Sequence, residues 1–341
     1  MVTKQQVTEI LDNILVPGAM RSLSKLNLVR EIAIIDQNVS VTLASTALSS
    51  GTQDWIKSKV SSELGQLEGV KGVNLNFVSA SPKEINRVDK IIAVMSGKGG
   101  VGKSLVAALM GIALTRNGKH VGVLDADITG PSIPKIFGLS GVHPNSSESG
   151  ILPVLTKSGI SIMSINLLLE REEDAVIWRG PIISRVIQQF WEDVLWGSLD
   201  YLIVDLPPGT ADAPLTVLQT IPVTGAVIVF SPQELAAMVV KKAVTMAKQL
   251  DIPILGIVEN MSYFVIPGTK KKLELFGKSR VREMSEATGA PLLAQIPIDP
   301  KLAKLCDDGK IELYNTKLVD NFSRNVMQAL QAKEKGNTAE N

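Results

Sequence analysis

The hydrophobic pattern of the chain changes near residue 88. From there on, short apolar runs that suit buried strands alternate with segments of helical spacing. The predicted strands are residues 91–95, 121–124, 161–165, 201–204, 225–230, 254–259 and 292–296. A helix is predicted over residues 234–250, because this segment follows Ser231-Pro232 and stops before Asp251-Ile252-Pro253. The alternation predicts an α/β fold with a mostly parallel sheet and helices on both faces.

The first 80 residues follow a different pattern. Apolar spacing predicts helices over 8–16 and 55–67, and strands at 32–35, 39–43 and 73–78. Asp36-Gln37-Asn38 predicts a turn between the first two strands. We therefore expect a small α/β domain over residues 1–80, a linker over 81–88, a larger domain over 89–332 and a polar, disordered tail over 333–341.

An amphipathic helix is predicted near the end of the chain, over residues 318–330. Its apolar positions recur every four residues at Leu318, Phe322, Val326 and Leu330. Such a helix can lie on a membrane surface or pack as the last helix of its own domain. Its polar face is mixed rather than strongly basic, which favours packing on its own domain.

Composition narrows the class of protein. A length of 341 residues suggests about two domains, and 45% hydrophobic residues allow a sizeable core. The formal net charge of +1 gives no support for a general nucleic-acid surface. No apolar run reaches the roughly 18 residues that a membrane span needs, and no signal-like segment is evident. A single cysteine excludes an internal disulfide and favours a cytoplasmic location.

The most informative motif occupies residues 97–104. It reads Gly-Lys-Gly-Gly-Val-Gly-Lys-Ser and matches the spacing of a phosphate-binding P-loop, between a predicted strand and a predicted helix. Glycines let backbone N–H groups turn inward around phosphate oxygens, so a turn that binds nothing is disfavoured. We expect Lys103 to contact the β- and γ-phosphates of ATP and the Ser104 hydroxyl to hold Mg²⁺. The predicted nucleotide-binding residues here are Gly97, Lys98, Gly99, Gly100, Val101, Gly102, Lys103 and Ser104.

Acidic residues at the ends of two other strands complete the predicted site. Asp205 ends an apolar strand, as in a Walker B motif, and is expected near Mg²⁺. Gly209, shortly after it, is expected to approach the γ-phosphate. Asp127 is assigned to orient the attacking water, and Asp125 to lie near Mg²⁺. Either of these two acids could instead cap the turn at Thr129-Gly130-Pro131.

Lys98 is an additional lysine near the start of the loop. A lysine here can swing toward the phosphates of a facing subunit and stabilise the charge of phosphoryl transfer, as an arginine finger does. This interpretation predicts a homodimer around two nucleotides, with Lys98, Lys103 and Asp127 as catalytic residues. The alternative is a solvated loop lysine.

These motifs resemble the Mrp/ApbC branch of the deviant-Walker-A ATPases, relatives of MinD. The resemblance covers nearly the full length, with a MIP18-type domain at the N-terminus and Lys98 as the signature lysine. It implies slow ATP hydrolysis, a role as iron–sulfur cluster carrier or scaffold, client or assembly proteins as partners, and Asn260 as the residue that reads adenine. The other segments that carry it are residues 125–132, Trp178-Arg179-Gly180-Pro181, residues 205–210, 258–264 and 295–300.

The chain departs from this family where a cluster would bind. The family places a Cys-x-x-Cys pair that binds a [4Fe–4S] cluster directly after Tyr263-Phe264, but residues 265–269 contain no cysteine. A homodimer supplies only two thiolates, both Cys306, whereas such clusters usually take four. Ile266 and Thr269 cannot replace thiolate ligands. No iron–sulfur ligands are identifiable, and Cys306 is interpreted as a buried or incidental cysteine.

Three hypotheses follow from the sequence. The first is a cytosolic, dimeric, Mg²⁺-dependent ATPase that works in iron–sulfur protein maturation. The second is an ATP-switched adaptor or regulatory ATPase without cluster binding, motivated by the missing cysteines. The third and weaker is a membrane-surface positioning ATPase, which depends on the helix over 318–330. We expect neither nucleic acid nor a membrane as partner.

Overall fold

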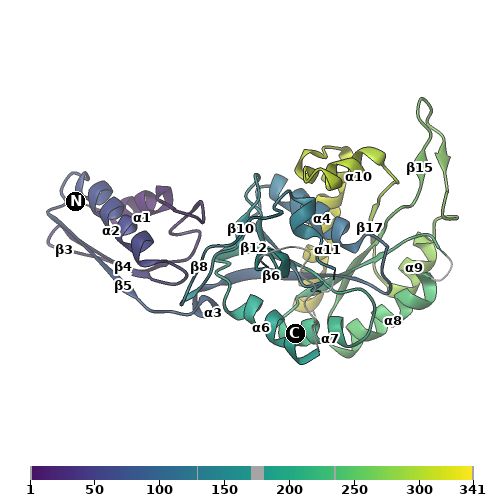
Figure 1. Ribbon diagram of the computed structural model, residues 1–341, viewed down its shortest axis with the longest axis horizontal. Helices are drawn as coiled ribbons and strands as arrows, with labels where there is room; N and C mark the ends of the chain where they lie inside the picture. Colours follow the sequence, from purple (N-terminus) through teal and green to yellow (C-terminus); the bar gives the residue numbers. More distant parts are fainter. Residues whose placement is uncertain (1, 129, 170–179, 234–235, 340–341) are drawn as a thin grey trace. The chain divides into compact units, whose positions relative to one another are not determined.

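The chain forms two compact units in a computed structural model that describes residues 2–128, 130–169, 180–233 and 236–339 (Figure 1). The smaller unit contains Met1–Asp89, His143–Leu155 and Gln189–Leu199. The larger unit contains Lys90–Val142, Thr156–Gln188 and Asp200–Asn341. Trp178 and Arg179 of the motif Trp178-Arg179-Gly180-Pro181 lie outside the described residues. Thr129 lies outside them too.

The smaller unit is a three-stranded sheet with two main helices. Strand β4 pairs antiparallel with β3 and parallel with β5. Its core combines alternate residues of β4, such as Val39 and Val41, with Ile56 and Val60 of α2. The elements are α1 (Lys4–Asn13), β1 (Leu15–Val16), β2 (Arg21–Ser22), β3 (Val29–Ile35), β4 (Asn38–Ala44), α2 (Ser50–Gly65), β5 (Gly72–Val78), α3 (Pro82–Ile85), β8 (Ser146–Ser147), β9 (Gly150–Ile151) and β10 (Val154–Leu155).

Local hydrogen bonds shift several predicted boundaries in this unit. Helix α1 starts earlier than predicted because Thr3 and Gln6 form a capping box, and it ends at Asn13 because residues 15–16 pair with 21–22. The turn after β3 is tighter than predicted. Asp36 and Gln37 both have positive φ, at 49° and 67°, which suits a two-residue hairpin turn. The expected linker contains the short helix α3.

Two segments from later in the chain complete the smaller unit, which the pattern of the first 80 residues did not predict. The buried guanidinium of Arg21 connects to one of them: it donates to the carbonyls of Trp196 at 2.7 Å and Ser198 at 3.0 Å, and to that of Lys25 at 3.0 Å. Burial lowers the pKa of Arg21 to about 10. Residues 196–198 therefore fill a position that local patterning cannot specify.

The larger unit is built on a parallel sheet, as the sequence predicts. Among the described residues, the strands of this unit follow the order β11-β7-β12-β6-β13-β14-β17 in the sheet. The pairs β11–β7, β12–β7, β13–β6, β13–β14 and β14–β17 are all parallel. The strands are β6 (Arg87–Ser96), β7 (Val121–Asp125), β11 (Ser161–Ser164), β12 (Ser198–Asp205), β13 (Gly225–Phe230), β14 (Ile254–Glu259) and β17 (Leu292–Gln295), with the hairpin β15 (Phe264–Val265) and β16 (Lys272–Leu273).

Helices cover both faces of this sheet. Figure 1 shows α4 above the sheet and α6, α7 and α8 below it. Helix α4 is apolar almost all round, because it lies between strand β7 on one side and α11 on the other. The helices are α4 (Lys103–Arg116), α5 (Ile133–Ile136), α6 (Gly180–Glu192), α7 (Asp212–Thr220), α8 (Ala236–Gln249), α9 (Val281–Thr288), α10 (Pro300–Asp307) and α11 (Lys317–Ala339).

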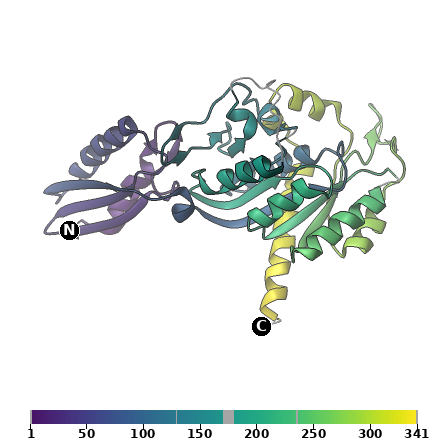
Figure 2. The same ribbon diagram turned by 60° about the horizontal axis from the view of Figure 1, so that its bottom comes forward.

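Helix α11, shown in yellow in Figure 2, packs its apolar stripe on its own unit. Of the predicted stripe, Phe322, Val326 and Leu330 are buried and Leu318 is partly buried. Val319 is buried as well, and the helix contacts α4, β14 and β17. These contacts favour the interpretation of residues 318–330 as a packed last helix. The helix continues to Ala339, so the prediction of a disordered tail from residue 333 is wrong for residues 333–339. Within the described residues, we find no helix with the length and apolarity required to cross a membrane.

The passage of residues 196–198 gives a stability prediction. Gly197 has φ of 66°, and a Cβ there would lie 2.6 Å from the Lys25 carbonyl oxygen and 2.8 Å from Leu26 Cα. Gly197→Ala is expected to lower the free energy of unfolding by about 2 to 4 kcal/mol, measured by urea denaturation. Gly289 has the same φ of 66° but open space around it. Gly289→Ala should therefore cost only about 1 to 2 kcal/mol. Equal losses in both variants would show that the positive φ alone, and not the close approach of Lys25 and Leu26, accounts for the destabilisation at position 197.

Candidate functional site

Polar residues line up along one edge of the parallel sheet. The register pairs Asp125 with Ser164 on one neighbouring strand and with Asp205 on the other. Further along, Glu259 pairs with Gln295. Because parallel strands place their carboxyl ends on the same edge, side chains from distant parts of the sequence meet here.

The P-loop, residues 97–104, joins β6 to α4 at this edge. It borders a cavity of about 320 Å³ that Asp127, Ser132, Ile136 and Pro208 also line. Gly102 begins the helix with φ of 78°, and a Cβ at this position would lie 2.2 Å from the Asn260 amide nitrogen. The predicted order of strand, glycine-rich loop and helix is confirmed, and the cavity has the position expected of a phosphate site at a helix N-terminus.

Lys103 and Asp205 form a buried ion pair beside this cavity. The lysine Nζ lies 2.6 Å from Asp205 Oδ1, and the two side chains are 6% and 0% exposed. Burial raises the pKa of Asp205, while Lys103 and the Ser104 hydroxyl act in the opposite direction. The second carboxylate oxygen, Oδ2, has no hydrogen-bond partner among the described residues.

This arrangement fits a magnesium ion. An unpartnered buried carboxylate oxygen near a serine hydroxyl offers the hard oxygen ligands that Mg²⁺ prefers. The described residues contain no group of three or more His, Cys, Asp or Glu side chains that could enclose a metal on their own. Mg²⁺ commonly takes few protein ligands and completes its shell with water and phosphate oxygens. One carboxylate and one hydroxyl are therefore enough protein ligands for such an ion.

Asp125 holds the segment after β7, in line with the alternative role of capping the turn that follows this strand. Its carboxylate accepts hydrogen bonds from the backbone N–H groups of Asp127, Ser132 and Ile133 at 3.0 to 3.2 Å, and from the Ser164 hydroxyl at 3.4 Å. Burial, and then the charge of Asp205, raise its pKa to about 8. Asp125 thus holds the segment that follows β7 in place. Its proximity to Mg²⁺ stays a prediction.

Asp127 is the acid that the structure brings to the cavity. It is 8% exposed and lines the same space as the P-loop. Because Asp125 anchors the backbone N–H of Asp127, the position of the Asp127 side chain follows from the buried network below it. The role of orienting water remains to be tested.

Lys98 and Gly209 contact their own chain here. The Lys98 ammonium donates to the Gln233 side chain. The Gly209 N–H donates to the Ser96 carbonyl at 3.1 Å, which fixes the residue near the end of β6. The action of Lys98 on a second subunit and the approach of Gly209 to a phosphate both stay predictions.

Asn260 lies directly against the P-loop. Its amide donates to the Val101 carbonyl at 2.8 Å, its side-chain oxygen accepts from Met261 N–H at 2.9 Å, and it is 2% exposed. In this arrangement it positions the loop, and the predicted contact with adenine stays a prediction.

The adjacent Glu259 organises a network that the sequence interpretation did not identify. Its buried carboxylate accepts from the hydroxyls of Ser262 at 2.5 Å and Ser279 at 2.8 Å, and from Gln295 Nε2 at 2.9 Å and Arg280 N–H at 2.8 Å. The available signal was the acid at the end of an apolar strand, which Glu259 shares with Asp125 and Asp205. The network attaches the start of α9 to the end of β14.

Cys306 lies on α10 and does not line the P-loop cavity. Its thiol is partly buried, and burial together with the charge of Asp307 raises its pKa to about 11. A thiol of this pKa supplies little thiolate near neutral pH, and the thiolate is the form that binds metals.

Two family models match the chain. The model described as NUBPL iron-transfer P-loop NTPase matches residues 87–332, and the model described as Iron-sulfur cluster assembly protein matches residues 4–75. The two matched ranges correspond to the two hydrophobic patterns that lie before and after residue 88.

Curated relatives cover most of the chain. The "Iron-sulfur cluster carrier protein" of Aquifex aeolicus is 41% identical over 287 residues, which are 76% of this chain and 79% of that protein. The protein of the same name from Synechocystis is 38% identical over 321 residues, 91% of each chain. The "Cytosolic Fe-S cluster assembly factor NUBP2 homolog" of Trichoplax adhaerens is 41% identical over 240 residues, 68% of this chain and 91% of that one.

Solved structures share the fold. A nucleotide-binding protein from Archaeoglobus fulgidus, in complex with ADP, is 47% identical, covers 69% of this chain and 92% of its own, and has a TM-score of 0.62. The MinC:MinD cell division complex of Aquifex aeolicus matches with 20% identity and a TM-score of 0.52, over 70% of this chain and 96% of that one. The latter likeness shows the fold alone.

The environment of Cys306 predicts a poorly reactive thiol. Since the chain has one cysteine, alkylation by iodoacetamide reports on this residue alone. With a pKa of about 11, its rate should be well below that of glutathione at pH 8 and should still be rising at pH 10. The unfolded chain in urea is the control and should react like glutathione. A rate that levels off below pH 9 in the folded protein would contradict the raised pKa.

Proposed function

The chain belongs to the family of NUBPL iron-transfer P-loop NTPases, and on this premise we propose that it is a Mg²⁺-dependent ATPase acting in iron–sulfur protein maturation. The resemblance predicted from the motifs is thus confirmed at the level of the family. The observation that carries the proposal is the cavity at the P-loop, which Lys103, Ser104 and Asp127 line.

Each polar group around the cavity has a task in the proposed reaction. The P-loop N–H groups and Lys103 bind the β- and γ-phosphates, for which Lys103 exchanges its contact with Asp205. Ser104 and Asp205 would hold Mg²⁺, whose charge offsets that of the phosphates. Asp127 orients the water that attacks the γ-phosphate. Because the described cavity offers one further lysine, Lys98, we assign it to the phosphates of a second subunit in a homodimer.

The cluster is treated as cargo, and the residues of this chain do not fit a four-thiolate site. Two copies supply two cysteines, each with a raised pKa. We therefore propose that partner proteins of iron–sulfur maturation supply cluster ligands, while this chain supplies nucleotide-dependent binding. The cytosol is the proposed location, in line with the name of the Trichoplax adhaerens relative. We propose residues 1–80 and 89–332 as the corresponding domains.

A second candidate function is an ATP-switched adaptor or regulatory ATPase without any cluster. The observation that favours it is the exposed hairpin β15–β16, which replaces the expected cysteine pair with Val265, Ile266 and the lysines 270–272. An adaptor would use the nucleotide to change its affinity for a client.

The two lysines of the P-loop are expected to separate binding from turnover. Lys103→Ala should abolish ATP binding, because it removes the main cation of the cavity. Lys98→Ala should keep ATP binding within a few-fold and lower turnover about a thousandfold, the size of an arginine-finger effect. Binding is measured with a fluorescent ATP analogue, turnover by phosphate release, and Lys157→Ala is the control on an exposed lysine.

Mixing the two inactive variants tests the in-trans role. A Lys103→Ala subunit still offers Lys98 to an ATP-loaded Lys98→Ala subunit, so mixed dimers should regain turnover. Wild-type turnover in Lys98→Ala alone, or no recovery in the mixture despite proven dimers, would contradict this assignment.

Anaerobic reconstitution with iron and sulfide distinguishes the two candidate functions. The chain alone is expected to hold well under the roughly four irons per dimer of a [4Fe–4S] cluster, with no difference between wild type and Cys306→Ser. Adding a thiol-bearing maturation partner should produce a stable cluster absorbance if the chain acts on clusters. Absence of any cluster in the mixture would favour the adaptor, and about four irons on the chain alone would contradict the ligand argument.

A further inference from the structure

A β-hairpin in the larger unit exposes an unusual set of apolar side chains. Residues 264–276 form the hairpin β15–β16 and the turn after it, and Figure 1 shows the hairpin extending beyond the sheet of its unit. Several of its apolar side chains are between 37% and 53% exposed, namely Val265, Ile266, Leu273, Leu275 and Phe276. Exposed apolar side chains gathered in one short segment are a mark of interaction sites.

The hairpin and the residues that follow it carry a local excess of positive charge. Residues 264–286 contain six basic and three acidic side chains, although the whole chain has a net charge of only +1. Lys270, Lys271 and Lys272 lie near the tip, and Lys278 follows the hairpin. Among the described residues, Lys270, Lys271 and Lys278 form no ion pair.

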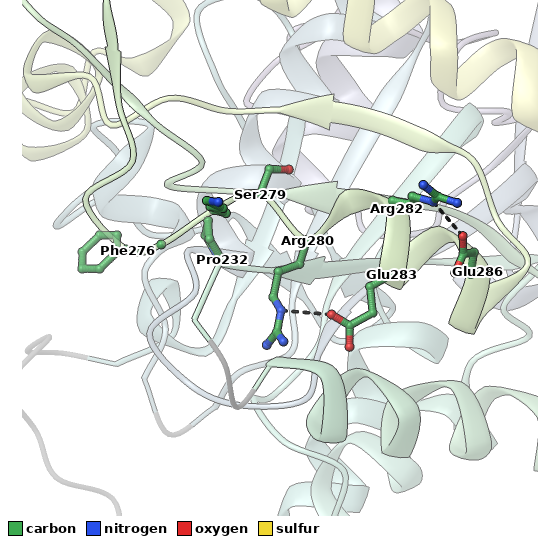
Figure 3. Close-up of a pocket in the computed structure, with 9 residues that line it drawn as sticks. Pro232, Phe276, Ser279, Arg280, Arg282, Glu283 and Glu286 are labelled. Atoms are coloured by element: carbon green, nitrogen blue, oxygen red, sulfur yellow. Dashed lines mark hydrogen bonds and ion pairs between the residues drawn. The ribbon is translucent and has the colours of Figure 1, made fainter.

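A cavity at the foot of the hairpin adds a second observation. It has a volume of about 560 Å³, and Phe276, Lys278 and Pro232 contribute to its lining. Figure 3 shows that the acids on its rim are engaged: Arg280 pairs with Glu283 and Arg282 with Glu286, each at 3.0 Å. Because each of these acids is paired with an arginine, the Phe276 ring and the Lys278 ammonium are available to contact a ligand.

The hairpin also presents an unpaired strand edge. Strand β15 pairs with β16 on one side and makes a bridge from Phe264 to Ile298 on the other. Strand β16 has no second partner among the described residues. An open edge of this kind can accept a further strand through backbone hydrogen bonds.

The hairpin is held in place at its base, so the surface exists before a partner arrives. The Ile298 N–H donates to the Tyr263 carbonyl at 2.7 Å, and the Lys272 ammonium lies 3.8 Å from the centroid of the Tyr263 ring. The Glu259 network fixes Ser262 before the hairpin and Ser279 after it. A preformed surface loses less conformational entropy on binding than a loose loop.

We propose that residues 264–278 are a docking site for an extended protein segment in which acidic residues alternate with apolar ones. The apolar side chains of the segment pack on Leu273, Leu275 and Phe276, and its carboxylates meet the lysines. The segment adds along the open edge of β16. This site goes beyond the proposed ATPase function and does not depend on it.

Charge and geometry disfavour two other occupants. A second copy in an isologous contact would bring the lysines of one hairpin against those of the other, which is repulsive. A membrane-inserting loop places apolar residues at its tip with lysines behind them. Here Lys270 and Lys271 share the tip with Ile266. The larger part of the exposed apolar surface, Leu273, Leu275 and Phe276, lies behind these lysines.

The test uses the full chain and a fluorescent peptide that alternates leucine with glutamate. Fluorescence anisotropy should show saturable binding that weakens as ionic strength rises from about 0.05 to 0.3 M. A peptide with serine in place of leucine and one with lysine in place of glutamate should each bind at least about tenfold more weakly. No saturable binding by the wild type would overturn the proposal.

Two variants and one matched control locate the site. Phe276→Ser with Leu275→Ser should weaken binding at least about tenfold, because it removes the apolar contact. Lys270→Glu with Lys271→Glu and Lys272→Glu should lose the glutamate peptide and gain the lysine peptide. The control changes Lys4, Lys57 and Lys71 to Glu, which alters net charge equally on exposed positions of the smaller unit and should leave binding unchanged. Equal losses in the control would overturn a local site.

Two further measurements decide between occupants. Sedimentation with vesicles of equal parts phosphatidylcholine and phosphatidylserine should leave the protein in solution, and sedimentation velocity should show the same oligomeric state for wild type and the lysine variant. Vesicle binding that the lysine variant loses would overturn the proposal in favour of a lipid surface. A change of oligomeric state would overturn it in favour of a second copy.

Discussion

The arrangement at the sheet edge depends on the buried contact between Lys103 and Asp205. One cation and one carboxylate lie 2.6 Å apart with almost no exposure, and Asp125 is the register neighbour of that carboxylate. Removing charges from water is costly, and it is offset only where partners are close and well oriented. Burial raises the pKa of both aspartates, because Lys103 alone offers their carboxylates too little positive charge to offset the loss of water. Under the proposed function, a Mg²⁺ ion at this edge would supply further positive charge and favour the ionised carboxylates.

The end of β14 connects this site to the exposed hairpin. Asn260 contacts the P-loop through Val101, and its neighbour Glu259 holds the residues on either side of the hairpin. The last residue of β14 and the residue directly after it therefore contact the P-loop on one side and the two ends of the hairpin on the other. A shift of Val101 on nucleotide binding would act on Asn260 and reach the base of the hairpin through the backbone.

The chain has the P-loop of its family but lacks, at the hairpin, the cysteine pair that the resemblance predicts. Residues 87–332 match the iron-transfer P-loop NTPases, and the P-loop cavity has the groups that phosphates require. At the hairpin, where the resemblance predicts a cysteine pair, the chain has lysines and apolar residues. Lysines and apolar side chains suit recognition of an acidic and apolar protein segment rather than ligation of iron. The chain therefore combines the P-loop of this family with a hairpin whose side chains do not suit iron ligation.

The sequence by itself determined the parallel sheet, the position of the P-loop and the acids at strand ends, because these follow from local periodicity and from spacing along the chain. Tertiary structure decided which acid faces the cavity: Asp127 lines it, whereas Asp125 is taken up by three backbone N–H groups. It also decided that Asn260 holds the P-loop, that Glu259 gathers Ser262, Ser279 and Gln295, and that residues 196–198 join the smaller unit. These outcomes depend on which strands become neighbours and on contacts between residues far apart in the chain, and the periodicity of a single segment specifies neither of them.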